Sequence, residues 1–353
     1  MEITVHAPGR VVFFGEHQDY LGCPVIPAAI DKKIVVTGSI IPDDYEISLT
    51  DMNELESFSS RVITYVKPRD YLRSGVKVLQ EEGVISEDKG VRAVIYGTIP
   101  IQAGLSSSSA LCVAWITFLS TLHEQSLTPM EITRLAHRAE VLEFNEPGGM
   151  QDHMASAFGY INYEEFTPVR CTRLAKDFPG IVVGNSLERK PTLDTLSRIK
   201  SRVKRALDRL GLEKLADMSK DDLEQTGIYK HDPEGMKYLR ASVMNREITE
   251  QAHKELRKSS PNPVVIGQLM DKHHSYLRDD LSISTPIIEK MIQQARRTGA
   301  LGCKITGSGN GGCMIAYCPG REKEVIRAIR SLGVEAFNVS ISPGASVISN
   351  DGR

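Results

Sequence analysis

The feature that most constrains the fold is a short glycine- and serine-rich segment between a strand-like stretch and an apolar helix. Residues Val91 to Ile99 have strand character, and Gly104-Leu105-Ser106-Ser107-Ser108-Ser109-Ala110 leads into an apolar run that ends near Leu119. At a helix N-terminus the first backbone N–H groups lack partners in the helix and carry partial positive charge. The segment is therefore either a phosphate cradle or a serine-rich helix cap without a ligand. It is not a Walker A loop, because no Gly-Lys-Ser/Thr closes it.

A second glycine-rich loop, Gly307-Ser308-Gly309-Asn310-Gly311-Gly312, lies between two apolar segments near the end of the sequence. Four glycines in six residues indicate backbone with positive φ and the close approach of another group to the main chain. Taken alone, the loop is either a binding loop or a tight turn between two strands.

Polar residues gather at two further turns. Arg10 and the run Gly15-Glu16-His17-Gln18-Asp19-Tyr20 flank an apolar strand, and Asp152 follows the pair Gly148-Gly149 at the start of a short helix. Carboxylates and imidazole bind sugar hydroxyls well, and an arginine can neutralise a transferring phosphoryl group. An aspartate in such a place can accept or orient a hydroxyl proton. The alternatives are a solvated charged turn and a helix N-cap.

Length and hydrophobic periodicity predict an α/β protein with two domains that share a cleft. A chain of 353 residues exceeds the usual size of one domain, and we place the domains at 1–165 and 166–353. The pattern predicts helices over 69–83, 129–143, 285–298 and 321–332, an apolar helix that follows Ala110 and runs through Leu119, a short helix from about Met150, and a helix-rich stretch from 193 to 277. It predicts strands over 11–14, 34–41, 91–99, 160–163, 181–185, 303–306, 313–317 and 335–341.

Charge and cysteine usage limit the partners and the compartment. The net charge of −2 gives no general attraction to nucleic acid or to an anionic membrane, so we expect neither partner. The six cysteines show no CxxC pair and no zinc-ligand spacing, which is typical of reduced, buried residues. With no signal peptide and no apolar run of membrane length, the sequence predicts a cytoplasmic protein, a monomer or a homodimer.

Taken together and in this order, the segments resemble the GHMP kinase family, and within it the galactokinases. The matching segments are Gly9-Arg-Val-Val-Phe-Phe-Gly-Glu-His-Gln-Asp-Tyr20, Ile99-Pro-Ile-Gln-Ala-Gly-Leu-Ser-Ser-Ser-Ser-Ala-Leu111, Gly149-Met-Gln-Asp152, His273-His-Ser-Tyr-Leu-Arg-Asp-Asp280 and Lys304-Ile-Thr-Gly-Ser-Gly-Asn-Gly-Gly-Cys313. Each is short, but their combination covers about residues 7 to 318 and is specific.

The resemblance implies the GHMP kinase fold, two α/β domains with the active site between them, and transfer of the γ-phosphoryl group of ATP to a sugar. By this resemblance, Asp152 is the base or orienting group and Arg10 its charge partner. Glu16, His17, Asp19 and Gly149 hold the sugar. Ser108 and Glu140 help to bind Mg²⁺. The ATP-binding residues are Gly104, Leu105, Ser106, Ser107, Ser108, Ser109, Gly307 and Gly309.

The sequence departs from the galactokinase pattern at several positions. Val12 and Leu21 replace asparagines, His153 stands in place of a glutamine, and the tyrosine expected about ten residues after Asn185-Ser186 is absent. The expected acceptor is therefore the anomeric hydroxyl of galactose or a relative. N-acetylgalactosamine, a uronic acid, arabinose and a heptose remain alternatives, as does a non-catalytic sensor of sugar and ATP.

Overall fold

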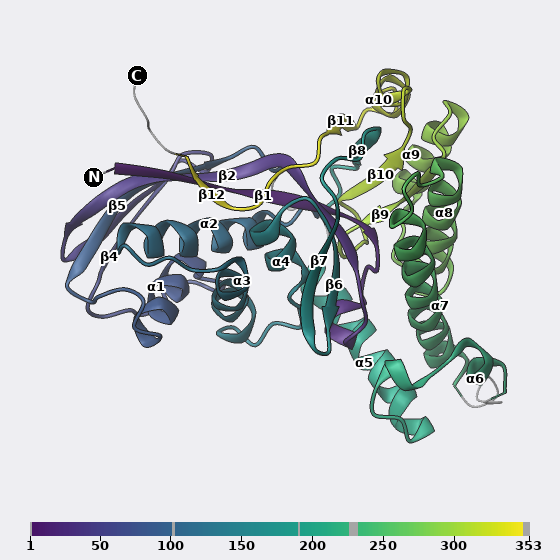
Figure 1. The fold of residues 1–353 in the computed structure, drawn as a ribbon, viewed down its shortest axis with the longest axis horizontal. Coiled ribbons are helices and arrows are strands. Elements are labelled where there is room, and N and C mark those ends of the chain that lie inside the picture. Colours follow the sequence, from purple (N-terminus) through teal and green to yellow (C-terminus); the bar gives the residue numbers. More distant parts are fainter. Residues whose placement is uncertain (1, 101–102, 190, 226–231, 349–353) are drawn as a thin grey trace.

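The computed structural model describes residues 2–100, 103–189, 191–225 and 232–348, and within them the strands form two sheets (Figure 1). The strands of the larger sheet are β1 (Glu2–Phe14), β2 (Ile26–Pro42), β3 (Asp44–Leu49), β4 (Glu54–Ser59), β5 (Lys89–Gly97), β6 (Ile161–Phe166), β7 (Val169–Ala175) and β12 (Ser346–Ile348). Their order is β12-β1-β2-β5-β3-β4, with β6 beside β2 and β7 beside β6. Strands β3 and β5 run parallel, and the other pairs are antiparallel.

Four helices cover one side of this sheet (Figure 1), within the part of the chain that the structure describes. They are α1 (Tyr71–Glu81), α2 (Ser107–Leu122), α3 (Pro129–His137) and α4 (Gln151–Phe158). Helix α2 is apolar on nearly all sides, and it is accordingly buried between the sheet and the other helices. Its Trp115 is fully buried and donates a hydrogen bond to the Leu72 carbonyl at 3.0 Å. The loop before α2 is therefore anchored by a rigid element.

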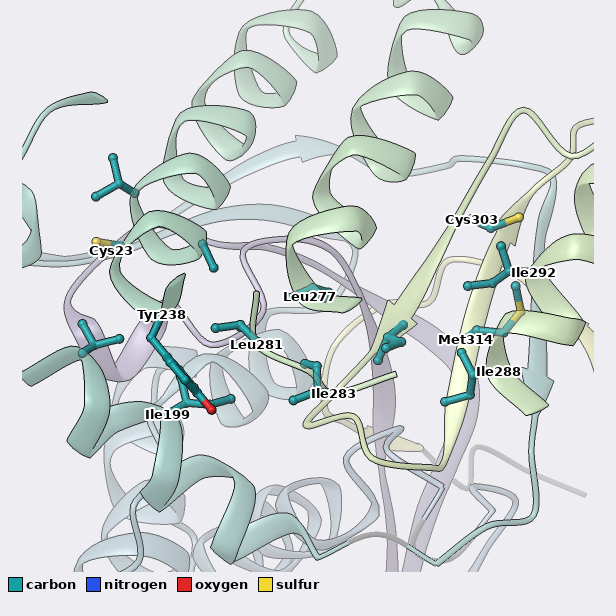
Figure 2. Close-up of a cluster of buried hydrophobic side chains, with 14 of the residues drawn as sticks. Cys23, Ile199, Tyr238, Leu277, Leu281, Ile283, Ile288, Ile292, Cys303 and Met314 are labelled. Atoms are coloured by element: carbon teal, nitrogen blue, oxygen red, sulfur yellow. The ribbon is translucent and has the colours of Figure 1, made fainter. Parts of the chain in front are cut away.

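The smaller sheet has the order β11-β8-β10-β9 and is antiparallel. Its strands are β8 (Ile181–Asn185), β9 (Gly302–Thr306), β10 (Cys313–Tyr317) and β11 (Glu335–Val339). The helices of this half are α5 (Thr192–Leu210), α6 (Lys220–Gln225), α7 (Pro233–Leu256), α8 (Pro263–Asp279), α9 (Pro286–Arg297) and α10 (Glu322–Arg330), of which α8, α9 and α10 pack on the sheet. Figure 2 shows their shared core, in which Leu277 of α8 and Ile288 of α9 lie among buried side chains near Met314 of β10.

Strand β1 connects the two halves of the molecule. Its Val11 and Phe13 belong to the same buried cluster as Val183 of β8 and Ile315 of β10. The Val12 backbone N–H donates to the Thr306 hydroxyl of β9 at 2.9 Å. The end of β1 and the loop that follows it are therefore held between the two sheets.

Most of the helices expected from periodicity are present with small changes in their bounds. Helix α3 begins with the expected Thr128 cap, which forms a capping box with Glu131, but it ends at His137 and continues as a π-helical turn, Arg138–Leu142. The expected strands are present as well, and the structure adds β3, β4, β7 and β12, which the pattern did not indicate. The domain boundary at 165/166 stays a prediction.

Two further features bear on the organisation of the chain. The sheets change between β7 and β8, and β12 returns to pair with β1 of the larger sheet. In the described ranges, no helix is both long enough and apolar enough for a membrane span.

Candidate active site

A cavity of about 710 Å³ brings together nearly all of the site residues that the sequence indicated. The predicted residues that line it are Arg10, Glu16, His17, Asp19, Gly104, Ser106, Ser107, Ser108, Ser109, Glu140, Gly149, Asp152 and Gly307. Leu105 and Gly309 do not line it. The Leu105 side chain is part of the core, and Gly309 packs against Ile283 on the far side of its loop.

Arg10 and Asp152 form a two-pronged ion pair at the centre of this cavity. The Arg10 Nε donates to Asp152 Oδ1 at 2.7 Å, and Nη2 donates to Oδ2 at 2.6 Å. The remaining Arg10 nitrogen, Nη1, donates to the Gly104 carbonyl at 2.7 Å. Arg10 is 4% exposed, whereas the side chain of Asp152 is 25% exposed. One guanidinium thus ties the partly exposed Asp152 carboxylate to the glycine-serine loop.

Asp19 lies beside this pair and is packed against Gly149. A Cβ atom at residue 149 would overlap the Asp19 carboxylate in its present position, so any larger residue there would displace Asp19. The Gln151 backbone N–H lies 3.4 Å from Asp19 Oδ2. Burial, followed by the nearby charge of Asp152, raises the pKa of Asp19 to about 6.

The turn after β1 places Glu16 and His17 in the cavity wall. His17 adopts a left-handed φ of 63°, and its Nδ1 lies 2.8 Å from the Tyr20 hydroxyl. Such backbone strain in a residue other than glycine is common at functional sites. Glu16 is 1% exposed and is paired with the buried Lys304 of β9.

The glycine-serine loop is open at the N-terminus of α2. Ser106 occupies the N-cap position with a φ of 65°, and its hydroxyl makes no capping hydrogen bond. By contrast, Thr128 caps α3 with its side chain. The serines of the loop therefore do not serve as the ordinary helix cap, and the α2 N-terminus remains suited to an anion.

The two glycine loops meet at this place. Gly307 has a φ of 83°, and a Cβ atom there would come within 2.7 Å of the Gly104 carbonyl. On the same loop, Asn310 donates to the Thr195 hydroxyl of α5 at 2.9 Å. The second loop thus closes one side of the predicted phosphate cradle and joins it to α5.

Glu140, in the π-helical turn, completes the cradle. Burial alone would raise its pKa, but His153 and hydrogen bonds from Ser108 and Ser109 outweigh burial and lower the pKa to about 2. Its Oε2 lies 2.6 Å from His153 Nε2. One ionised carboxylate with a neighbouring hydroxyl fits Mg²⁺, which takes few protein oxygens and completes its shell with phosphate and water.

Three parts of the wall were missed by sequence reasoning. Ile34 of β2 lines the first part, residues at the ends of β3 and β5 line the second, and the start of α5 lines the third; they are Ile34, Leu49, Met52, Ile95, Tyr96, Thr192, Leu193 and Leu196. Their alternation is that of ordinary core strands, so no local signal marks them. Behind the site, Glu164 is fully buried, and burial with the charges of Asp152 and Asp19 raises its pKa well above the usual range.

Comparison with known proteins agrees with this geometry. Residues 70–160 match the GHMP kinases N terminal domain, residues 252–335 match the GHMP kinases C terminal domain, and residues 1–40 match the galactokinase galactose-binding signature. The mevalonate kinase of Pyrococcus furiosus is 29% identical over 97% of each chain. The galactokinase of Haemophilus influenzae is 29% identical over 93% of this chain and 88% of its own.

Among solved structures, Lactococcus lactis galactokinase complexed with galactose has the same fold, with a TM-score of 0.86 at 23% identity over 98% of this chain and 95% of its own. The matches to the GHMP kinase models and to galactokinase and mevalonate kinase relatives identify the chain as an ATP-dependent kinase. The chain is a GHMP kinase, built from the N- and C-terminal domains of that family.

Proposed function

We propose that this kinase transfers the γ-phosphoryl group of ATP to the anomeric hydroxyl of a neutral sugar, galactose or a close relative. The observation that carries this proposal is the charge of the cavity wall. Among the described lining residues, the two arginines are both engaged by carboxylates: Arg10 by Asp152 and Arg69 by Glu146. Carboxylates in the wall therefore outnumber the cations that an anionic substrate would need.

The arrangement of Asp19, Glu16 and His17 supports a substrate rich in hydroxyls. Each of these side chains can accept a hydrogen bond from a hydroxyl, and all three come from one turn that the galactose-binding signature covers. A carboxylate on the substrate would face acidic groups without a free cation, which is unfavourable in a partly buried site. This argues against a uronic acid, and against mevalonate, the substrate named for several relatives.

In the proposed reaction, Asp152 accepts a hydrogen bond from the attacking hydroxyl and takes its proton as the new bond to the γ-phosphorus forms, while the bond from that phosphorus to the β–γ bridging oxygen breaks and ADP leaves. Arg10 keeps Asp152 fixed and adds positive charge beside the transferring group. The open N-terminus of α2 and the backbone of residues 104–109 hold the ATP phosphates. Mg²⁺, held by Ser108 and Glu140, would neutralise the phosphate charge.

The intact cradle supports catalysis rather than sensing. A sensor needs only to bind, whereas this site also holds an aspartate on a bidentate arginine within reach of the phosphate loop. We further propose a cytoplasmic location, because no disulfide joins the six cysteines, all of which the structure describes.

The test is ADP release with Mg·ATP and a panel of acceptors: galactose, N-acetylgalactosamine, arabinose, mannose, galacturonate and mevalonate. Galactose and galacturonate form the sharpest pair, since they differ only in the carboxylate at C6. We expect a kcat/KM for a neutral sugar that exceeds the value for galacturonate by about 100-fold or more, equal to about 3 kcal/mol. Preferred turnover of mevalonate or galacturonate would contradict the proposal.

A further inference from the structure

Lys304 of β9 is a fully buried lysine whose ammonium group ends beside the cavity wall. Its Nζ donates to Glu16 Oε1, to the Val12 carbonyl at 3.0 Å and to the Ile305 carbonyl at 2.8 Å. An ammonium group has three hydrogens, so its capacity is used in full. The lysine is therefore fixed in place and cannot itself donate to a ligand.

Glu16 is left with one oxygen to offer. Its Oε1 is taken by Lys304, whereas Oε2 makes no hydrogen bond with the described residues, although it is buried. The ring nitrogen Nδ1 of His273, on α8, lies 3.7 Å from Oε2, which is beyond hydrogen-bond distance. An unsatisfied buried carboxylate oxygen is costly, and a hydroxyl that donates to it would remove the cost.

Lys304 is the neighbour that most favours the charged form of this carboxylate. Burial raises the pKa of Glu16, and Lys304 acts against that rise more than any other neighbour. His273 does not help, because burial and the charge of Lys304 hold its pKa well below the usual range, which leaves it neutral. Arg10 is nearby, but its nitrogens are bonded to Asp152 and Gly104.

We propose that Lys304 is a positioning residue for the acceptor substrate: it holds Glu16 as a carboxylate by one oxygen and leaves the second oxygen to a substrate hydroxyl. This rests on the proposed function, in which Glu16 binds the sugar. Lys304 belongs to the smaller sheet and Glu16 to the turn after β1, so the smaller sheet sets the affinity of a subsite on the other half of the molecule.

The test is a double-mutant cycle with Lys304→Met, Glu16→Gln and the two combined, measured on the sugar that the wild type phosphorylates. Each single change should raise the sugar KM about 10-fold or more, the loss of one charge-assisted hydrogen bond, with kcat and the KM for ATP within about 3-fold. If Lys304 acts through Glu16, the double variant should match Glu16→Gln within about 2-fold, since no carboxylate remains to be held.

Thr306→Val is the matched control. It removes another buried bond between β9 and Val12, and it leaves Glu16 with its partner. It should lower the melting temperature without raising the sugar KM. An equal KM rise in this variant would mean that any loosening of the β9 contact weakens binding, and the inference would be wrong.

Two outcomes separate this inference from the proposed function. Turnover of a neutral sugar by the wild type, with an unchanged KM in Lys304→Met, overturns the role of Lys304 alone. If the wild type phosphorylates no neutral sugar, both the proposed function and the role of Lys304 are wrong. If Lys304→Met does not fold, the double variant, which lacks both charges of the pair, still tests the inference. A sugar KM well above that of Glu16→Gln would contradict the idea that Lys304 acts through Glu16.

Discussion

The two parts of the cavity use different physics. At one part, formed by the turn after β1 and the start of α4, Arg10, Asp19 and Asp152 are charged groups held by specific partners. At the other, formed by β2, β3 and β5, apolar side chains such as Leu49 and Tyr96 make a wall with few ionisable groups. The first part can bind the hydroxyls of an acceptor through directional hydrogen bonds. The second part can bind the flat nucleotide base through buried apolar contact.

This difference predicts how sensitive each part is to mutation. A charged side chain that acts on the reacting atoms contributes little once its charge is removed. Truncation of an apolar side chain instead weakens ligand binding in proportion to the contact area that is lost. The following variants compare how much activity or affinity is lost on mutation in the charged part, in the phosphate cradle and in the apolar part.

Asp152→Asn should have the largest effect. The amide cannot take the hydroxyl proton, so we expect kcat to fall by about 10²- to 10⁴-fold, with the KM for ATP nearly unchanged. ADP release under saturating Mg·ATP measures it. Asp177→Asn, at an exposed aspartate, is the control and should leave kcat unaltered. If Asp152→Asn retained the kcat of the wild type, Asp152 would not be the group that accepts the hydroxyl proton.

Glu140→Gln should raise the Mg²⁺ concentration needed for half-maximal activity by about 10- to 100-fold. Because the pKa of Glu140 is about 2, the effect should be the same from pH 6 to pH 8. A magnesium titration at fixed ATP measures it. Glu143→Gln is the control: Glu143 follows the same π-helical turn but bonds to Lys77, outside the cavity. An equal shift in both variants would contradict metal binding by Glu140.

Asp19 should make sugar binding sensitive to pH. Its pKa of about 6 means that the carboxylate gains a proton as the pH falls through 6, so the sugar KM should rise there. In Asp19→Asn the KM should be raised, by about 10-fold, and should not vary with pH in this range. The sugar KM of the wild type and of Asp19→Asn, measured from pH 5 to pH 8, tests this. If the KM of the variant still rises at low pH, the titrating group is not Asp19.

The same residue should limit stability at neutral pH. The folded pKa of about 6 lies above the usual pKa of an aspartate, so Asp19 favours the folded state in acid and loses that contribution as the pH rises through 6. At pH 7.5, Asp19→Asn should therefore unfold at a higher temperature, with a gain of at most about 3 kcal/mol. A thermal melt measures it, and a lower melting temperature would show that the carboxylate stabilises the fold.

Tyr96→Ala, in the apolar part, should have the smallest effect. Loss of part of the base contact should raise the KM for ATP by about 3- to 10-fold, or roughly 1 kcal/mol, and leave kcat and the sugar KM unchanged. Val94→Ala changes the same exposed face of β5 two residues earlier, outside the cavity, and is the control. A larger effect on the sugar KM would mean that the two parts are not separate.

The charged part could be predicted from the sequence, and the apolar part could not, for the same physical reason. Glu16, His17 and Asp19 stand next to each other in a turn bounded by glycines, and that grouping has no explanation in core packing. Leu49, Ile95 and Tyr96 alternate like any strand that packs on a core, so function leaves no mark on them. The turn between β3 and β4 was not expected at all.

Buried partners were equally hidden from the sequence. Lys304 was visible only as part of a glycine-rich motif, and its bond to Glu16 joins residues that are 288 positions apart. Glu164 lies in a polar stretch that resembles a surface strand. Contacts over such separations depend on the packing of the two sheets, which periodicity along the chain does not describe.

The pairing of β12 with β1 links the first segment of the chain to one made hundreds of residues later. During synthesis β1 and β2 leave the ribosome before β12. Until β12 is made, Thr4 and His6 of β1 lack their strand partners, Ile348 and Ser346. Until then, the nascent chain carries a strand edge with unsatisfied backbone groups, which is a template for misassembly between chains. The three-residue strand β12 therefore protects this part of the edge of the larger sheet only after it has been synthesised.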